Sequence, residues 1–247
     1  MFTQSRSHPV PLLLTRPKAQ GADFAERLIA RFGDELNIIK TPLLAPKFFA
    51  PVLPAGPFSA LILTSQTGVE GYIRLSGADL LPKDVFCVGE RTADAAREAR
   101  LIPVCVAEDA ASLIAQIKVQ RPEGKLLHLR GRDTRGNITN LLQSAGIDTI
   151  DMVIYAQEQL ALTDAAVTVL RAQVPVIVPL FSPRTAVIFA AEMARIKCIS
   201  PLFVAKMSGD VALEARNLDA QVMIAQRPDA AAMVDVVALL LAELQRA

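Results

Sequence analysis

The residues best suited to chemistry stand at four junctions, where a short apolar run meets the start of an amphipathic helical pattern. Each junction carries a hydroxyl residue or a glycine, and the candidate binding residues are Thr64 and Ser65, Gly89 and Thr92, Ser182 and Pro183, and Ser208 and Gly209. The first backbone N–H groups of a helix have no partner within it, and the positive end of the helix dipole faces outward there. Such an end binds carboxylate or phosphate groups. Four such junctions predict a ligand with several negative groups.

A cluster of arginines follows another apolar run. Its members are Arg130, Arg132 and Arg135, with Gly131 and Gly136 among them. The fork of N–H groups on arginine suits the two oxygens of a carboxylate or phosphate, although the same residues would be ordinary in a solvated loop. Thr15 and Arg16 end the first apolar run of the chain in an equivalent place, which favours the ligand role. The further candidate binding residues are therefore Thr15, Arg16, Arg130 and Gly131.

Tyr155 is the candidate catalytic residue. It is one of two tyrosines, and it lies in a segment from Thr149 to Gln159 that is apolar and rich in β-branched residues. Its phenol could donate a proton to a departing hydroxide, and a strand tyrosine that only packs is the equally supported alternative. The other tyrosine, Tyr72, lies within a helical pattern, where packing is the expected role.

Several enzyme classes lack their motifs in this sequence. It has no G-x-S-x-G nucleophile elbow, no Walker A loop and no G-x-G-x-x-G dinucleotide fingerprint. His8 and His128 are its only histidines, and it has no Cys-x-x-Cys pair. We therefore expect neither a metal site nor a Ser-His-Asp triad.

Composition sets further bounds. The chain has 247 residues, of which 52% are hydrophobic and 21% are charged, enough to bury a large core. A net charge of +1 indicates neither a nucleic-acid nor a membrane partner. We find no signal-peptide pattern and no apolar stretch of the ~20 residues that cross a bilayer. The three cysteines are expected to be reduced thiols in a cytosolic protein.

An alternation of strands and helices must position these residues. Apolar runs alternate with helical patterns along the whole chain, which predicts an α/β fold, with parallel sheets and helices on both faces. The runs form two sets of four, one near Leu12, Val176, Leu202 and Val222 and one near Leu61, Val85, Val104 and Leu126. Two similar domains follow, with a single large sheet as the alternative. Pro179 fits poorly, because a proline inside a central strand requires a bulge or a later strand start.

The two predicted domains differ in their continuity along the chain. The outer α/β domain would combine residues 1–36 with residues 162–247, and the inner α/β domain would run from 53 to 147. Residues 37–52 and 148–161 would connect them as extended segments. A pair of extended connections predicts a hinge, and a cleft between two domains is a natural ligand site.

Five segments, in this order, resemble motifs of the uroporphyrinogen-III synthases. Residues 63–69 (LTSQTGV) resemble the family segment F-T-S-x-x-x-V, and residues 88–93 (VGERTA) resemble V-G-x-x-T-A. Residues 129–131 (LRG) precede a helical pattern ending near Gly146, like the family's G…L…L…G helix. Residues 153–155 (VIY) resemble its V-Y strand, and residues 181–186 (FSPRTA) match F-S-P-x-x-A. The order and spacing match across nearly the whole chain.

This resemblance implies two doubly wound α/β domains joined by a two-stranded β-ladder, with the active site between them. It implies a monomeric, cofactor-free enzyme of tetrapyrrole synthesis, which serves haem, sirohaem or cobalamin. The substrate would be hydroxymethylbilane, a chain of four pyrroles that each carry an acetate and a propionate. Ring closure with the last pyrrole inverted and with loss of water would give uroporphyrinogen III, and Tyr155 would assist the loss of hydroxide. The family often has threonine after the last Ser or Gly, whereas this chain has Asp210, which would repel a carboxylate.

Two other functions remain open on the sequence alone. One is a cytosolic two-domain protein that binds an anionic metabolite without catalysis. The other is an α/β enzyme similar to a sugar-phosphate isomerase, which would need a His or Glu base near Ser65 and Ser182. A transient contact with hydroxymethylbilane synthase, the preceding enzyme of the pathway, is also left open.

Overall fold

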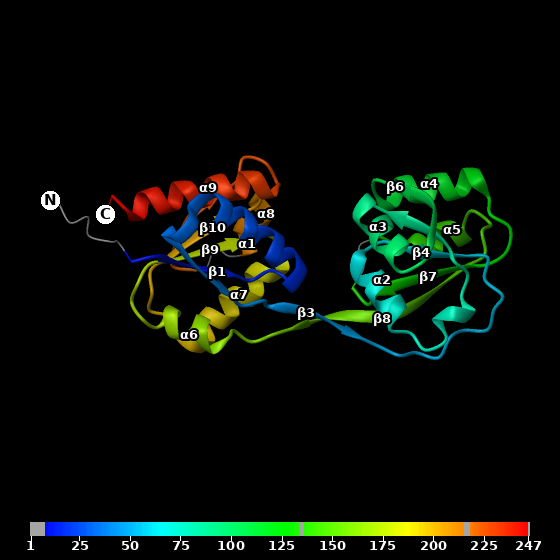
Figure 1. The fold of residues 1–247 in the computed structure, drawn as a ribbon, viewed down its shortest axis with the longest axis horizontal. Helices are drawn as coiled ribbons and strands as arrows, with labels where there is room; N and C mark the ends of the chain where they lie inside the picture. The colour runs from blue at the N-terminus through cyan, green and yellow to red at the C-terminus, as the bar shows by residue number, and fades with distance from the viewer. Residues whose placement is uncertain (1–7, 134–135, 215–217, 247) are drawn as a thin grey trace. The chain divides into compact units, whose positions relative to one another are not determined.

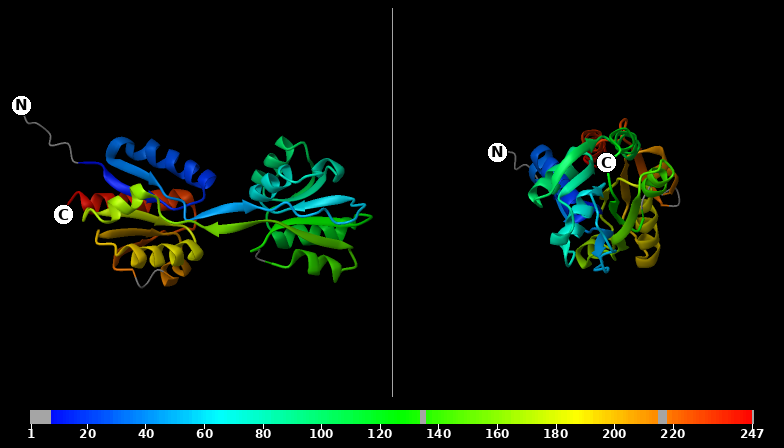
Figure 2. Two further views of the ribbon diagram at one scale, coloured as in Figure 1. Left: turned by 90° about the horizontal axis from the view of Figure 1, so that it is seen from below. Right: turned by 90° about the vertical axis from the view of Figure 1, so that its right-hand side faces the viewer.

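The computed structural model describes residues 8–133, 136–214 and 218–246. The chain forms two compact units, one made of the residues up to Ala45 together with those from Gln159 onward, and the other made of Pro46–Glu158. Each unit has a sheet with helices on both of its faces (Figures 1 and 2), and apart from the pair of β3 (Leu44–Phe48) and β8 (Thr149–Gln159) the strands are parallel. The expected α/β fold with two doubly wound sheets is therefore confirmed.

The sheet of unit 1 has five parallel strands in the order β11-β10-β9-β1-β2. The strands are β1 (Val10–Leu14), β2 (Leu36–Lys40), β9 (Val176–Leu180), β10 (Leu202–Lys206) and β11 (Ala220–Ile224). The helices are α1 (Lys18–Phe32), α6 (Asp164–Leu170), α7 (Pro183–Ile196), α8 (Gly209–Glu214) and α9 (Ala230–Leu244), and a 3-10 turn spans Gly33–Glu35. One core lies under α6, α7 and α8, and a second core lies under α1 and α9.

The sheet of unit 2 has six strands in the order β3-β8-β7-β4-β5-β6. They are β3 (Leu44–Phe48), β4 (Ala60–Leu63), β5 (Asp84–Val88), β6 (Ile102–Ala107), β7 (Leu126–Gly131) and β8 (Thr149–Gln159). The helices are α2 (Gln66–Ile73), α3 (Glu90–Glu98), α4 (Ala110–Gln120) and α5 (Ile138–Gln143), with a 3-10 turn at Ala78–Leu80. Two cores again form, one on the side of α2 and α3 and the other on the side of α4 and α5.

Strands β3 and β8 connect the two units as an antiparallel pair (Figure 1). The amide of Phe49 donates to the carbonyl of Ile154 at 2.8 Å, and the amide of Leu160 donates to the carbonyl of Leu43 at 2.9 Å. The two residue numbers in each pair add to the same sum, as antiparallel register requires. The two-stranded ladder that the family resemblance implied is present.

Two local expectations differ from the structure. Residues 36–40 form β2, which pairs with β1 in the sheet of unit 1, whereas residues 37–52 were expected to be a connection. Ile38 and Ile39 pack against the two cores of unit 1, and these apolar contacts hold the segment in the sheet. Strand β9 also contains Pro179 without a bulge and keeps continuous register with β10. Its ladder with β1 is recorded at Leu12 and Ile177, so the proline lies beyond that pairing.

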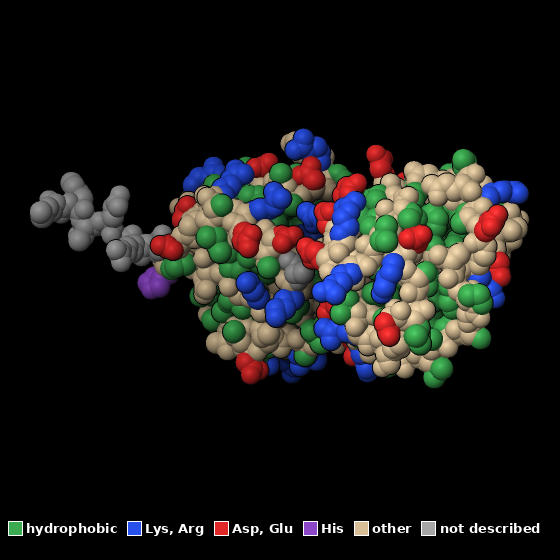
Figure 3. Space-filling view, turned by 45° about the vertical axis from the view of Figure 1, so that its right-hand side comes forward, with side chains coloured by type: hydrophobic (Ala, Val, Ile, Leu, Met, Phe, Trp, Pro, Cys, Tyr) green, Lys and Arg blue, Asp and Glu red, His purple; other side chains and the backbone are tan. Residues whose placement is uncertain are grey.

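No helix within the described residues is long and apolar enough to cross a membrane. Basic and acidic side chains are intermixed on the face that Figure 3 shows, in keeping with a net charge of +1.

Candidate active site

The order of the strands singles out one position in each sheet. In unit 1 the chain winds from β1 to β2 on one side and from β9 to β11 on the other, so the direction reverses between β1 and β9. In unit 2 the corresponding reversal lies between β4 and β7. Connecting loops diverge at such a switch point and leave a crevice at the carboxyl ends of the strands, where open α/β sheets bind their ligands.

Most of the predicted binding residues lie at these two switch points. Thr15 and Arg16 follow β1, and Ser182 and Pro183 follow β9, so both pairs flank the reversal in unit 1. Thr64 and Ser65 follow β4, and Arg130 and Gly131 end β7, so these four flank the reversal in unit 2. Gly89 and Thr92 follow β5, and Ser208 and Gly209 follow β10, each one strand away from the reversal. Sequence spacing alone could not rank the junctions in this way.

Ser65 and Tyr155 form the centre of the site in unit 2. Ser65 caps helix α2, and its Oγ accepts a hydrogen bond from the amide of Gly68 at 3.0 Å. The same Oγ lies 3.0 Å from Tyr155 Oη, and the two hydroxyls share a hydrogen bond. This contact joins residues 90 positions apart in the chain. It places the phenol of Tyr155 at the end of β4, beside the positive end of the α2 dipole.

Gly131 explains how the ring of Tyr155 reaches this position. The two residues are paired in the ladder between β7 and β8, where the register shifts by one residue. A Cβ atom at Gly131 would lie 2.8 Å from two carbons of the Tyr155 ring and 3.0 Å from its Oη. A side chain at this position would therefore displace the ring. Gly131 acts through this close approach and not through a left-handed backbone, because its φ is not positive.

Arg130 has partners within the protein. Its Nε donates to Asp151 Oδ2 at 2.5 Å, and its Nη1 donates to the carbonyl oxygens of Gly131 at 3.0 Å and Arg132 at 3.4 Å. The guanidinium thus holds the loop after β7 in place. Arg130 therefore has a structural role in this loop. A direct contact between Arg130 and a ligand remains a prediction.

The switch point of unit 1 contains a cation and a buried hydroxyl. The guanidinium carbon of Arg16 lies 4.0 Å from the centre of the Phe181 ring, so the residues that follow β1 and β9 are in contact. Thr15 is 1% exposed, and its Oγ1 has no hydrogen-bond partner among the described residues. Ser182 caps α7 and accepts from the amide of Thr185 at 3.2 Å, with Pro183 in the first turn of the helix.

The two outer junctions are less elaborate. Gly89 has a φ of 77° and begins α3, and its amide donates to the carbonyl of Ala107 at 2.7 Å. Thr92 is 5% exposed, so its side chain belongs to the core side of α3. Ser208 and Gly209 stand at the start of α8, a helix of 6 residues. Asp210 is exposed in the first turn of that helix, as its position in the sequence predicts.

Lys206 is a residue of the strand ends that sequence reasoning did not select. It is the last residue of β10 and is 2% exposed. Burial lowers the pKa of its ammonium group, because the charged form loses its hydration. The available signal was a single lysine at the end of an otherwise apolar run, directly before Met207 and Ser208.

His128 lies in strand β7 and is buried. His128 is 3% exposed, and burial lowers the pKa of its imidazole to about 4. Its Nδ1 lies 3.3 Å from Thr139 Oγ1, and the two side chains share a hydrogen bond. Among the described residues, no three His, Cys, Asp or Glu side chains gather as metal ligands.

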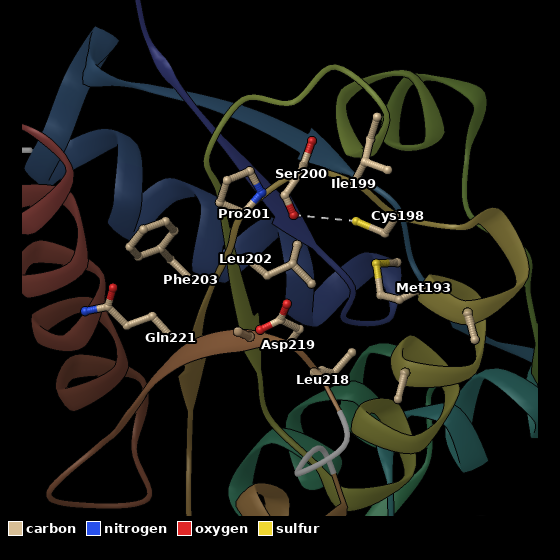
Figure 4. Close-up of a pocket in the computed structure, with 13 residues that line it drawn as sticks. Met193, Cys198, Ile199, Ser200, Pro201, Leu202, Phe203, Leu218, Asp219 and Gln221 are labelled. Atoms are coloured by element: carbon tan, nitrogen blue, oxygen red, sulfur yellow. Dashed lines mark hydrogen bonds between the residues drawn. The ribbon is translucent and has the colours of Figure 1, made fainter.

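A cavity of about 570 Å³ opens at the other end of the sheet in unit 1. It is lined by the amino ends of β10 and β11, by the loop from Cys198 to Pro201 and by the last turns of α7 (Figure 4). Cys198 Sγ lies 3.7 Å from the carbonyl oxygen of Ser200 in this loop. The cavity is therefore separated by the length of the strands from Ser182 and Ser208.

The fold defines a protein of two α/β units. Each unit has polar residues at the switch point of its sheet, at the carboxyl ends of parallel strands. The family model described as HEM4, uroporphyrinogen-III synthase HemD, matches residues 26–235. The chain therefore belongs to the uroporphyrinogen-III synthase family, and it is an enzyme of tetrapyrrole synthesis. This confirms the family predicted from the sequence motifs.

Two solved structures align with nearly the whole chain. The uroporphyrinogen-III synthetase from Helicobacter pylori 26695 aligns with a TM-score of 0.61 at 15% identity, over 94% of this chain and 99% of that chain, and shares its fold. A mutant uroporphyrinogen III synthase from the extremely thermophilic bacterium Thermus thermophilus aligns with a TM-score of 0.48 at 14% identity, over 96% of this chain and 100% of that chain. A search of curated proteins finds no match.

Proposed function

We propose that this enzyme is a cyclising lyase, which converts hydroxymethylbilane into uroporphyrinogen III with inversion of the last pyrrole and release of water. The hydrogen bond of 3.0 Å between Ser65 Oγ and Tyr155 Oη carries this proposal. The proposal is supported because this bond holds a phenol hydroxyl, a group able to donate a proton, at the switch point of unit 2, the kind of position at which open α/β sheets bind their ligands.

Recognition of the substrate would use the strand ends of both units. Every pyrrole of hydroxymethylbilane carries two carboxylates, so the substrate needs several anion sites. Helix N-termini contribute ~0.3–1 kcal/mol each at exposed positions, and hydrogen bonds to a charged group contribute ~1.5–3 kcal/mol each. The substrate-binding residues we propose are those of the sequence prediction: Thr15, Arg16, Thr64, Ser65, Gly89, Thr92, Arg130, Gly131, Ser182, Pro183, Ser208 and Gly209.

Tyr155 would act as the general acid of the first step. The phenol gives its proton to the hydroxyl of the hydroxymethyl group, the C–O bond breaks, and water leaves. An azafulvenium cation and a phenolate remain. Ser65 already accepts from Gly68, so its own O–H is free to donate to the phenolate. Hydrogen bonds to an ionised oxygen are about twice as strong as neutral ones, so this contact strengthens as the step proceeds.

Positioning would decide which isomer forms. The substituted α-carbon of the last pyrrole attacks the cation and gives a spiro intermediate, which fragments and closes again with that ring inverted. The proton released when the pyrrole regains aromaticity returns to the phenolate, so the cycle balances with water as the only by-product. Holding the chain in one folded shape removes much of the entropic barrier to this route.

The test is an isomer assay with freshly generated hydroxymethylbilane. The enzyme should yield predominantly type III product, whereas spontaneous closure yields type I. Exclusive formation of type I at every enzyme concentration would contradict the proposal. Stoichiometric binding of hydroxymethylbilane without accelerated closure would instead support the alternative of an anion-binding protein without catalysis.

The cellular setting is a further part of the proposal. We propose a monomer in the cytoplasm that contacts hydroxymethylbilane synthase only transiently. All three cysteines are free thiols, which fits a reducing compartment, and burial raises the pKa of Cys87 to about 11, which keeps this thiol protonated and unreactive. Light scattering during gel filtration should give one chain per particle, and a stable complex with the synthase in the same experiment would contradict a transient contact.

A further inference from the structure

The segment after Gly131 contains an arginine whose charge no residue of the described chain neutralises. Arg132 lies one residue beyond the end of β7, and it is exposed. Its guanidinium carbon lies 4.9 Å from the centre of the Phe49 ring. Within the described residues it forms no ion pair, whereas Arg130 pairs with Asp151 and Arg74 pairs with Glu70.

The backbone ties both members of this pair to the strand that carries Tyr155. The amide of Arg132 donates to the carbonyl of Tyr155 at 2.8 Å, and the amide of Phe49 donates to the carbonyl of Ile154 at 2.8 Å. Two consecutive residues of β8 therefore fix the positions of Phe49 and Arg132. Arg132 and Phe49 are therefore hydrogen-bonded through their backbones to the strand that carries the phenol of Tyr155.

Stacking on Phe49 prepares the guanidinium for a carboxylate. An arginine that stacks on an aromatic ring keeps the N–H groups at its edge available, and the stack restricts the side-chain rotations that binding would otherwise have to freeze. The planar fork matches the two oxygens of a carboxylate with two parallel hydrogen bonds. Such a site distinguishes carboxylates by their position and not only by their charge.

We infer that Arg132, held on Phe49, binds a carboxylate of the pyrrole that carries the hydroxymethyl group, and thereby positions that group for Tyr155. The inference rests on the proposed function. Arg132 belongs to the arginine cluster seen in the sequence but is not among the candidate binding residues chosen there, so the contact is an additional one. Ser65 and Gly131 would fix the phenol, while Arg132 and Phe49 would fix the ring on which it acts.

Steady-state kinetics with hydroxymethylbilane provide the first test. Replacing Arg132 with Gln should raise KM about tenfold, which corresponds to about 1.4 kcal/mol, and should increase the share of type I product. Arg132→Lys keeps the charge and loses the fork, so its KM should lie between those of the wild type and Arg132→Gln. Replacing Phe49 with Leu should raise KM about threefold.

Arg31→Gln is the matched control. Arg31 is also exposed and stacks on an aromatic ring, with its guanidinium carbon 5.6 Å from the centre of Phe32. It belongs to unit 1 and has its own carboxylate partner, Asp235, at 2.5 Å. Its replacement should leave both KM and the isomer ratio unchanged.

Equilibrium binding gives a readout that does not depend on turnover. Uroporphyrinogen has an acetate and a propionate on each ring, whereas coproporphyrinogen has a methyl group in place of each acetate. Arg132→Gln should weaken the binding of uroporphyrinogen III about tenfold. An unchanged affinity for coproporphyrinogen III would assign Arg132 to an acetate, and a parallel loss would assign it to a propionate.

Unchanged KM, isomer ratio and uroporphyrinogen affinity in a folded Arg132→Gln variant would overturn the inference. The proposed function would stand in that case, provided that the wild type still produces type III product. Absence of type III product from the wild type would instead overturn the proposed function itself. Far-ultraviolet circular dichroism and thermal unfolding of each variant identify any loss of folding.

Discussion

Tyr155 depends on two residues that are far from it in sequence. Ser65 shares a hydrogen bond with its hydroxyl at 3.0 Å, and Gly131 leaves room for its ring. The second tyrosine has a different environment, because Tyr72 Oη donates to the carbonyl of Ala78 at 3.2 Å and accepts from Lys83 Nζ at 3.1 Å. The two phenols can therefore be separated by mutation, one within the proposed site and one in the core.

Replacing Tyr155 with Phe should lower kcat about 10- to 100-fold and leave type III as the main product. Proton donation contributes ~10²–10⁴-fold in enzymes, and the effect lies at the low end here because the hydroxyl of the substrate departs readily without help. Tyr72→Phe should leave kcat unchanged while lowering stability. A kcat of Tyr155→Phe equal to that of the wild type would exclude the acid role.

Replacing Gly131 with Ala should lower kcat about as much as Tyr155→Phe does. The added methyl group would approach the Tyr155 ring to 2.8 Å, so the ring must move away from Ser65. Crowding of this kind also costs ~1–3 kcal/mol of stability. Gly21→Ala is the matched control, since a Cβ there would meet its nearest atom at an ordinary 3.4 Å. Normal kcat in Gly131→Ala would show that the ring position does not matter.

Most of the proposed anion sites lie at the first turns of helices. Ser65, Asp109 and Ser182 each accept a hydrogen bond from the backbone amide three residues further on. All three side chains stabilise a helix in the same way. Their positions in the sheets differ, because β4 and β9 flank switch points whereas β6, which precedes Asp109, lies at the edge of its sheet.

This difference predicts that equal losses of stability will have unequal effects on catalysis. Ser65→Ala and Asp109→Ala should each reduce the free energy of unfolding by ~1 kcal/mol, as N-cap substitutions do. Only Ser65→Ala should also lower kcat, about tenfold, because it removes the hydroxyl that shares a hydrogen bond with Tyr155. Chemical denaturation and steady-state kinetics measure the two effects separately. A similar fall in kcat for both variants would mean that the effect arises from stability alone.

In the whole molecule, each unit has its own buried cores. Unit 2 also contains a buried titratable side chain, His128. Folding lowers the pKa of His128 from 6.5 to about 4, mainly because burial opposes the charged imidazolium. The unfolded chain therefore binds more protons than the folded chain between these two values. Stability must then fall as the pH decreases from about 6.5 to about 4.

Replacing His128 with Gln should flatten this pH dependence. A shift of this size corresponds to a loss of roughly 3 kcal/mol between pH 7 and pH 4, and the variant should lose less over the same range. Denaturant unfolding of the full chain at several pH values measures how the free energy of unfolding depends on pH. Identical slopes for wild type and His128→Gln would contradict a buried neutral imidazole.

Local interactions made the strand–helix junctions predictable from sequence. An N-cap serine satisfies amides within three residues of itself, and a proline after it fits the first turn of a helix, so Ser65, Ser182 and Pro183 could be placed without tertiary information. The alternation of runs and helices also predicted parallel sheets with helices on both faces. The pairing of Leu36 to Lys40 with β1 was missed, because a whole helix separates the two strands in the sequence.

The remaining features depend on contacts that span the chain, which only the tertiary structure decided. The strand order placed four of the strand ends beside the two switch points. It also brought Tyr155 to Ser65 across 90 positions and gave Arg130 a carboxylate partner in Asp151. It also left Arg132 without a carboxylate partner among the described residues. The sequence by itself determined where helices begin, because their ends are set by nearby residues, whereas side-chain partners were decided by which strands lie next to each other.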